Sequence, residues 1–504
     1  MTFESDNSDG SSSQVQASND SKEKPNSQLF AFACAILSCM TSILLGYDIG
    51  VMSGAVIYIQ KDLKITDVQV EILAGVLNLY CLVGSFAAGK TSDLIGRKFT
   101  IVVAAAIFFA GALLMGLAGS YAWLMFGRFV AGIGVGFALV IAPLYTAELA
   151  PASARGFLSS FPEIFINVGI LFGYLSNWAF SKLSLTLGWR VMLGIGAVPS
   201  VFMGIGVLAM PESPRWLVLK GRLGDAKRIL LKTSTTKEEA TERLLAIQEA
   251  AGIPADCKDE KVKPPKAEKG HSVFQDLLIH PTPAVRKILI ANLAMHFFQQ
   301  ASGIDAVVLY SPRIFKKAGI ETDEALLKAT VAVGFVKLLS IMIATIFMDK
   351  IGRRPLILTS LGGMIVSVGL LATGLTVIDQ HPGTKLGWAI VLSVVMVLAY
   401  VSFFSMGMGP VTWVYTSEIF PLKLRAQGTG LGVGLNRVMS GVISMTFLSM
   451  SKALTIGGSF YLFGGVALVG WIFCYTFLPE TQGKNLEDME ALFGGKPAAP
   501  QEGL

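Results

Sequence analysis

Two charged residues lie within long apolar stretches of the sequence. Asp48 is part of "LLGYDIGVMSGA", inside an apolar run from about residue 29 to residue 59, and Arg128 lies in "GRFVAGIGVGF", inside another. A charged side chain in lipid is costly unless it is paired, and such residues mark ion and proton pathways. Burial favours the protonated form of a carboxyl group, and a nearby cation favours the ionised form. An aspartate that alternates between these surroundings can load a proton on one side of a membrane and release it on the other.

A second group of polar residues, later in the chain, suits the recognition of hydroxyl groups. Gln299 and Gln300 are adjacent in "HFFQQASGID", and a glutamine amide both donates and accepts hydrogen bonds, as a hydroxyl does. Trp413 follows a Gly-Pro break in "MGMGPVTWVY" and offers an apolar face together with one N–H donor. The alternatives are that the glutamines join helices through amide hydrogen bonds and that Trp413 is a packed core aromatic.

The composition places these residues in a lipid bilayer. Of the 504 residues, 53% are hydrophobic and 15% are charged, whereas about a quarter of the residues of ordinary soluble proteins are charged. Only helices and closed barrels satisfy their backbone hydrogen bonds in lipid, and the apolar runs lack the period-two alternation of barrel strands. The sequence therefore predicts an all-α membrane protein with many spans.

Twelve apolar runs are long enough to cross a bilayer as helices. They cover residues 29–59, 70–95, 99–119, 122–147, 156–181, 189–210, 287–315, 327–349, 355–378, 387–420, 426–450 and 457–479. Between the two sets of six lies a hydrophilic segment whose apolar residues recur at spacings of three and four, which predicts short amphipathic helices. The predicted organisation is a disordered N-terminus, an N-terminal half, a linker, a C-terminal half and a tail, at 1–27, 28–210, 211–286, 287–480 and 481–504.

The distribution of basic residues predicts the orientation. Lysine and arginine concentrate in the linker, in "GKTSDLIGRK" and in "DKIGRRP", and most connections on the opposite side contain few of them. Because basic residues are retained on the cytoplasmic side, we expect both termini and the linker in the cytoplasm.

The two sets of six runs repeat each other. "DLIGRK" matches "DKIGRR", "YTAELAPASARG" matches "YTSEIFPLKLRAQG", and "PESPRW" matches "PETQGK", in the same order and at similar offsets. The repeats imply duplicated halves, an architecture in which the substrate site lies between the halves near the middle of the membrane.

These segments, together with "FFQQASGID" and "GPVTWVYTSEIFP", resemble the signatures of the sugar porters of the major facilitator superfamily. Within that family the chain most resembles the plant polyol and monosaccharide transporters, which are proton symporters. The resemblance implies the major facilitator superfamily fold, with twelve transmembrane helices in two six-helix halves plus cytoplasmic helices. It implies proton-coupled uptake of a linear polyol, inositol or monosaccharide by alternating access. We further expect a plasma-membrane protein that functions as a monomer, with the proton as coupling ion and no other cofactor.

The resemblance also assigns roles to individual residues. It implies that Asp48 carries the proton and that Arg128 tunes its acidity, although the two could instead form a permanent structural ion pair. The residues implied at the solute site are Gln299, Gln300, Trp413 and Asn436. The charged residues implied in a cytoplasmic gating network are Asp93, Arg97, Glu148, Arg155, Asp349, Arg353, Glu418 and Arg425. Alternatively, the basic residues of this network only keep their loops on the cytoplasmic side of the membrane.

Three residues replace an amide of the hexose porters with a charge. Asp305 and Lys337 stand where those porters usually have asparagine, and Glu163 stands where they usually have glutamine. Because buried charges in a membrane should be paired, we expect Asp305 to pair with Lys337. Such a pair could bind the hydroxyls of a linear polyol, or it could only hold two helices together. Glu163 is placed at the solute site and is also a candidate second protonatable group.

Other functions fit the sequence less well. Passive uniporters of this family usually lack the first-helix aspartate, and non-transporting solute sensors often carry a long cytoplasmic tail, whereas the tail after Glu480 is short. The sequence has no metal-ligand spacing, no nucleotide-binding loop and no nucleophile–base pair, so we expect neither a metal site nor an enzyme. His296 is interpreted as a hydrogen-bonded packing residue, and Arg437 has no assigned role. The expected partners are a small polyol or sugar, protons and the lipid bilayer, and no nucleic acid.

Overall fold

The structure is a computed structural model that describes residues 25–149, 161–234, 236–251, 253–254, 262, 277–279, 281–382, 384–421, 424–482 and 492–494. The predictions for residues 1–24, for Arg155 and for most of the tail lie outside these residues. Within them, all regular secondary structure is helical, as predicted.

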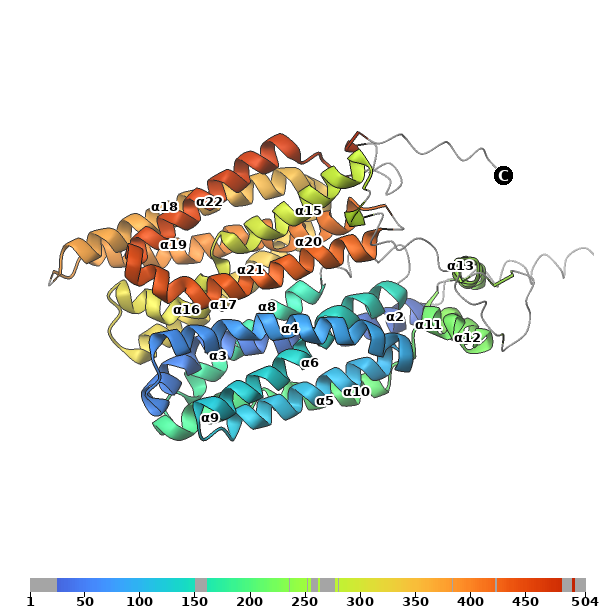
Figure 1. Cartoon of the computed structure of the whole chain (residues 1–504), viewed down its shortest axis with the longest axis horizontal. Coiled ribbons are helices and arrows are strands. Elements are labelled where there is room, and N and C mark those ends of the chain that lie inside the picture. The colour runs from blue at the N-terminus through green and yellow to red at the C-terminus, as the bar shows by residue number, and fades with distance from the viewer. Residues whose placement is uncertain are drawn as a thin grey trace, which may run out of the picture.

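The N-terminal half contains six helical passes, drawn in blue to teal in Figure 1. They are α2 (Pro25–Cys39) continued by α3 (Ser42–Leu63), α4 (Asp67–Ile95), α5 (Arg97–Gly116), α6 (Tyr121–Leu149), α8 (Phe161–Phe180), and α9 (Leu185–Gly194) continued by α10 (Ala197–Leu208). Helix α2 begins at Pro25, slightly before the predicted end of the disordered N-terminus, and proline is well suited to the first turn of a helix.

The C-terminal half contains six further passes, drawn in yellow to red and lying alongside the first six (Figure 1). They are α15 (Pro283–Ala301) continued by α16 (Ile304–Lys317), α17 (Asp323–Ile351), α18 (Arg353–Gln380), α19 (Gly387–Met406) continued by α20 (Met408–Glu418), α21 (Arg425–Leu454) and α22 (Ile456–Phe477). The twelve passes in the described residues correspond to the twelve predicted runs, with ends that differ by a few residues.

Ten of these passes are long and apolar enough to cross a membrane by themselves. The other two are α8 and the α15–α16 pass, which carry polar side chains such as Glu163 on α8 and Gln299 and Gln300 on α15. These two passes carry polar groups into the helical bundle, as do some of the more apolar passes, such as α3 with Asp48.

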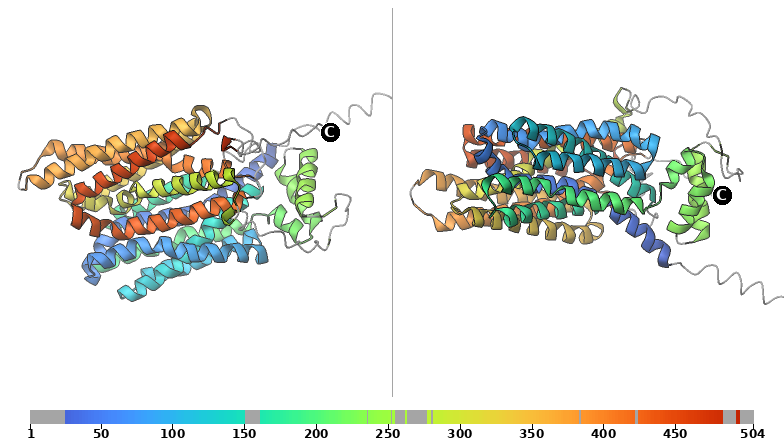
Figure 2. Two further views of the ribbon diagram at one scale, coloured as in Figure 1. Left: turned by 45° about the horizontal axis from the view of Figure 1, so that its top comes forward. Right: turned by 90° about the horizontal axis from the view of Figure 1, so that it is seen from below.

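Three short helices lie beyond one end of the bundle, as Figures 1 and 2 show in green. They are α11 (Pro214–Leu219), α12 (Leu223–Thr233) and α13 (Lys237–Ala250). Leu217, Val218 and Leu223 are buried in a small apolar core that these helices share. They occupy the linker for which amphipathic helices were predicted.

Glycines allow α3 and α8 to pack backbone against backbone. A Cβ on Gly46 or Gly50 of α3 would collide with the carbonyl oxygens of Ile166 and Ile170 on α8. Similarly, a Cβ on Gly136 of α6 would collide with a backbone carbonyl of α4. Small residues are the usual means of such close approach in membranes. These contacts fix the positions of α3, α4, α6 and α8 relative to one another.

Candidate functional site

Asp48 and Arg128 form a buried ion pair. Their exposed fractions are 2% and 1%, and Nη1 of Arg128 on α6 lies 2.5 Å from Oδ2 of Asp48 on α3. The same guanidinium donates from Nε to the Leu73 carbonyl oxygen at 3.0 Å and from Nη2 to the Ala74 carbonyl oxygen at 3.2 Å, both on α4. The pair therefore joins three helices of the N-terminal half. Protonation of Asp48 would remove the negative charge that holds Arg128 toward α3.

Gln299, Gln300 and Asn436 form a chain of amide hydrogen bonds between α15 and α21. Asn436 Nδ2 donates to Gln299 Oε1 at 2.7 Å, and Gln300 Nε2 donates to Asn436 Oδ1 at 3.1 Å. All three side chains are buried, and Gln300 Oε1 has no hydrogen-bond partner in the described part of the chain. The group thus has a buried acceptor available for a hydroxyl donor.

The break between α19 and α20 supplies backbone acceptors for the same group. At Gly407 the backbone leaves the helix, with φ −140° and ψ −71°. Gln299 Nε2 donates to the carbonyl oxygens of Met408 and Gly409, each at 3.0 Å. A side-chain amide therefore satisfies backbone groups at the break, as an interrupted helix in a membrane requires.

Trp413 and His296 lie next to this amide group. The two rings, on α20 and α15, pack edge to face with centroids 5.1 Å apart. Trp413 is partly buried, whereas His296 is fully buried with Nε2 3.4 Å from Thr416 Oγ1. The surroundings of His296 are those of a packing residue with one weak polar contact.

The predicted ion pair between Asp305 and Lys337 is wrong. Both residues are described, and no nitrogen–oxygen distance of 4 Å or less joins them; Asp305 on α16 instead accepts a hydrogen bond from Ser440 Oγ on α21. The buried Lys337 on α17 interacts electrostatically with Glu163 on α8 as well as with Asp305. The prediction considered only the seventh and eighth helices, whereas the fold packs α8 of the other half against α17.

Charged side chains surround the turn between α4 and α5. Arg97 contacts Asp93 at 3.2 Å and Glu148 at 3.1 Å, and Glu148 also accepts a hydrogen bond from Ser213. Glu212 accepts hydrogen bonds from the backbone N–H groups at the start of α5, including that of Arg97 at 2.8 Å. A carboxylate at this place satisfies free N–H groups and the positive end of the helix.

The same arrangement recurs in the C-terminal half. Arg353 Nη2 lies 2.9 Å from Glu418 Oε1, and Thr481 donates to Glu418 at 2.9 Å. Glu480 accepts from the backbone N–H of Arg353 at 3.0 Å. Arg425 donates to the Phe420 carbonyl oxygen. The remaining two residues of the predicted network are Arg155 and Asp349. Arg155 and the side chain of Asp349 lie outside the part of the chain that the structure describes.

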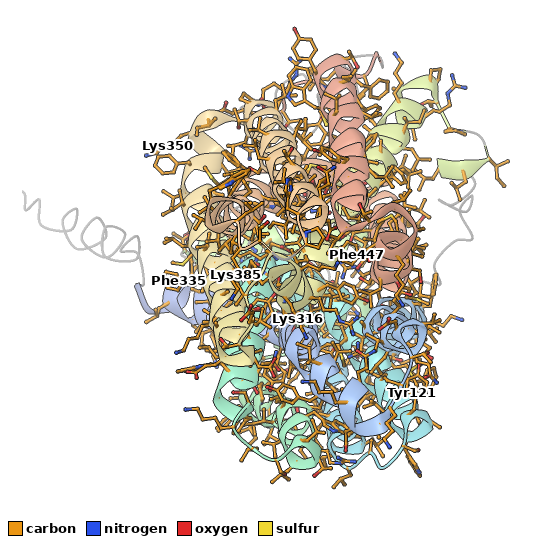
Figure 3. The ribbon with its side chains drawn as sticks, turned by 90° about the vertical axis from the view of Figure 1, so that its left-hand side faces the viewer. Tyr121, Lys316, Phe335, Lys350, Lys385 and Phe447 are labelled. Carbon is orange, nitrogen blue, oxygen red and sulfur yellow. The ribbon has the colours of Figure 1, made fainter. Side chains whose placement is uncertain are left out.

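Ion pairs join the two halves at the opposite end of the bundle, which Figure 3 faces. Asp67 at the start of α4 pairs with Arg313 at 3.4 Å and with Lys452, and Lys61 pairs with Asp323 at 3.6 Å. Both ion pairs of Asp67 reach the other half of the molecule. These ion pairs therefore hold the two halves together at the end of the bundle that is predicted to face outward.

A family model described as "Sugar (and other) transporter" matches residues 34–493. The chain belongs to this family of sugar transporters. Among its relatives, it is 66% identical over 472 residues to "Polyol transporter 5" of Arabidopsis thaliana, a match that covers 94% of this chain and 87% of the relative. It is 63% identical to "Putative polyol transporter 1" of the same plant, covering 98% of this chain and 96% of the relative.

A solved sugar transporter has the same fold. This is XylE of E. coli, described as a major facilitator superfamily proton:xylose symporter and bound to 6-bromo-6-deoxy-D-glucose. The likeness has a TM-score of 0.75 at 27% identity and covers 92% of this chain and 99% of that one. The family and the fold together make this chain a multi-pass membrane transporter and not an enzyme.

Sequence reasoning missed several polar residues of this sugar transporter. Glu212 and Glu480 cap helices, and their signal was present in the repeated "PESPRW" and "PETQGK". Glu71 is a buried carboxylate in an apolar run, the same signal that identified Asp48. Asn78 and its contact with Arg437 had no signal in the sequence, because that contact depends on how the two halves pack.

Proposed function

We propose that this sugar transporter is a proton-coupled symporter that takes up a small polyhydroxylated solute by alternating access. The observation that carries the proposal is the Asp48–Arg128 pair, which is buried inside a membrane protein. Asp48 lies on α3, which packs against α8 and α16, the helices that carry Glu163 and Asp305. Asp48 is the proton carrier, because its protonation releases Arg128 from its only carboxylate partner within 4 Å among the described residues. The similarity to a protein described as a proton:xylose symporter supports this assignment.

The energy available from protons is sufficient for concentrative uptake. One proton crossing about 100 mV releases about 2.3 kcal/mol. Each pH unit adds about 1.4 kcal/mol. Together these terms support roughly 500-fold accumulation of a neutral solute at one-to-one coupling.

The solute-binding residues in this proposal are Gln299, Gln300, Asn436 and Trp413, with the charged residues Glu163, Asp305 and Lys337 beside them. Amides supply donors and acceptors, the indole supplies an apolar face, and the charged groups supply stronger hydrogen bonds to hydroxyls. A site with so many charges favours a flexible linear polyol over a hexose ring. The similarity to proteins named polyol transporters supports the same solute class.

The orientation and location are part of the proposal. The basic turns, the linker helices and both termini face the cytoplasm, and the Asp67 ion pairs face outward. The protein acts in the plasma membrane as a monomer, since a single chain contains both halves and the site between them. The cytoplasmic charges around Arg97 and Arg353 serve as a gate that opens and closes the inner end.

The experiment that tests the proposal measures solute-evoked current in voltage-clamped cells that express the chain. Sorbitol, xylitol, myo-inositol and glucose are the probes, and uptake of labelled solute is measured in the same cells. The parent protein should give an inward current that grows as the external pH falls. The Asp48→Asn variant should lose this current while it still equilibrates solute. Uptake by the parent without current at any pH would instead establish a passive uniporter.

A further inference from the structure

Helices α4 and α21 form the polar contact line between the two halves, and they lie side by side in Figure 1. At the outer end, Asp67 of α4 pairs with Lys452 of α21. One turn deeper, Glu71 Oε1 accepts from the Ser449 backbone N–H at 2.7 Å. Deeper still lies Arg437, which is the innermost of these contacts and the residue for which the sequence suggested no role.

Arg437 connects the solute-site amides to the N-terminal half. Its Nη2 donates to Asn436 Oδ1 at 2.6 Å, and its Nη1 donates to Asn78 Oδ1 on α4 at 3.4 Å. All three residues are buried, with exposed fractions of 8% for Arg437, 0% for Asn436 and 4% for Asn78. A planar guanidinium can bridge two amide acceptors in this way, which a lysine ammonium does less well.

Asn78 lies one helical turn after Ala74, one of the two α4 residues whose carbonyl oxygens hold Arg128. A shift of α4 at Asn78 would therefore change the position of the acceptors that orient Arg128 toward Asp48. Arg437 of the C-terminal half and Arg128 of the N-terminal half thus contact the same short stretch of α4. This stretch, residues 73–78, therefore contacts both a member of the proton pair and the arginine that is bonded to the solute-site amides.

Asn436 Oδ1 has no capacity for a further strong hydrogen bond. It already accepts from Gln300 Nε2 and from Arg437 Nη2, and a carbonyl oxygen has two lone pairs. A solute hydroxyl that donates to this oxygen must displace one of the two donors. Displacement of Arg437 would weaken its hold on Asn78 and so remove one of the polar contacts between α21 and α4.

Charged and titratable groups face Arg437 from several helices. Electrostatic interactions reach it from Glu163 on α8, His296 on α15 and Cys81 on α4. Asp305 and Lys337 interact with Glu163 in turn, and Asp48 and Arg128 interact with Cys81. Glu163 is therefore one of the acids whose charge acts on Arg437.

We propose that Arg437 is the positioning residue that links solute binding to proton exchange. Solute that binds at Asn436 displaces the Arg437 guanidinium, which loosens the contact between α21 and α4 and shifts the α4 carbonyls that hold Arg128 against Asp48. The inference rests on the proposed symport. It adds the route by which the occupied solute site acts on the proton pair.

The test uses purified protein in liposomes and two substitutions that break the bridge at different ends, Arg437→Gln and Asn78→Ala. Sorbitol is the probe, its binding is followed by tryptophan fluorescence, and the proton-to-solute ratio is obtained from reversal potentials. Both variants should retain sorbitol binding and lose accumulation against a gradient, so that sorbitol only equilibrates. The Arg437→Lys variant should not restore coupling. The matched control is Arg313→Gln, which removes another arginine contact between the halves, and it should keep the parent's ratio.

An unchanged proton-to-solute ratio in Asn78→Ala overturns the inference, even where Arg437→Gln fails to fold. The inference is also overturned if both variants bind sorbitol more weakly but keep the parent's proton-to-solute ratio. Arg437 would then contribute to solute binding and not to coupling. A parent protein that moves no protons contradicts the proposed symport itself, which is a distinct outcome.

Discussion

At Gln300, one amide contributes to the fold and, in the proposed function, to recognition of the solute. Its nitrogen donates to Asn436, while its carbonyl oxygen is buried without a partner among the described residues. Leaving a buried acceptor unpaired costs roughly 1–3 kcal/mol. A solute hydroxyl that donates to this oxygen would recover that cost, so the unpaired atom itself favours binding of a hydroxyl-rich molecule.

The Gln300→Leu variant tests this acceptor. It removes a hydrogen bond worth about 0.5–1.5 kcal/mol, so the affinity for sorbitol should fall between about twofold and tenfold. Tryptophan fluorescence titration of purified protein measures the change. The control is Gln427→Leu, an exposed glutamine on α21 that should leave affinity unaltered. Equal affinities in the Gln300 variant and the parent would remove this side chain from the site.

The Lys337→Asn variant tests the choice of solute. Restoring the asparagine of hexose porters removes a buried cation beside Glu163 and should shift the preference from sorbitol toward glucose. Competition for uptake of labelled sorbitol gives the ranking. Lys328→Asn, an exposed lysine earlier on the same helix, is the matched control. If the ranking of solutes stayed the same, Lys337 would have no role in specificity.

At the scale of elements, glycines determine how closely the helices that carry the site approach. Gly46 and Gly50 on α3 face the backbone of α8, and Asp48 lies between them in sequence on α3. The close α3–α8 packing holds the helix that carries Asp48, whose own side chain faces Arg128 of α6. The position of the carboxyl group that is proposed to carry the proton therefore depends in part on residues that carry no functional group.

The Gly50→Leu variant should destabilise the protein severely. The new side chain would collide with the Ile170 backbone, which cannot move without separating the two helices. Overpacking of this kind costs about 1–3 kcal/mol or more. Thermal unfolding in detergent measures the loss. At Gly89 an added Cβ meets nothing within 4 Å, so Gly89→Leu is the control and should unfold near the parent temperature. A stable Gly50→Leu protein would contradict the proposed packing role.

At the scale of the whole molecule, the two ends of the bundle are held by different contacts. The end that is proposed to face the cytoplasm is called the inner end here, and the opposite end the outer end. At the inner end, carboxylates such as Glu212 and Glu480 cap helices within one half, and the pattern occurs twice. At the outer end, Asp67 and Glu71 contact the opposite half. The outer contacts must break whenever the outward side opens, whereas the inner contacts described here can move with their own half.

The Glu71→Gln variant should shift the population toward the outward-open state. Glu71 accepts from both the backbone N–H and the hydroxyl of Ser449, and bonds to a charged group contribute about 1.5–3 kcal/mol each. Loss of one such bond shifts the equilibrium by about tenfold or more. Labelling of the free, buried Cys81 by a membrane-impermeant thiol reagent added outside should accelerate. The exposed Glu324 provides the control variant, Glu324→Gln, and equal labelling rates for both would contradict a closing role for Glu71.

The sequence by itself determined the helical fold, the twelve passes and the repeated halves, because a bilayer imposes helix length and apolarity on each span separately. Asp48 and Arg128 were also identifiable, since a charge in an apolar run is costly wherever its partner lies. The tertiary structure alone decided which charges meet. Lys337 interacts electrostatically with Glu163 of the other half as well as with Asp305, and Arg437 contacts Asn78 of the other half. Both interactions cross the interface between halves that are far apart in sequence. Pairing across that interface depends on the packing of whole helices, and no local pattern of residues specifies it.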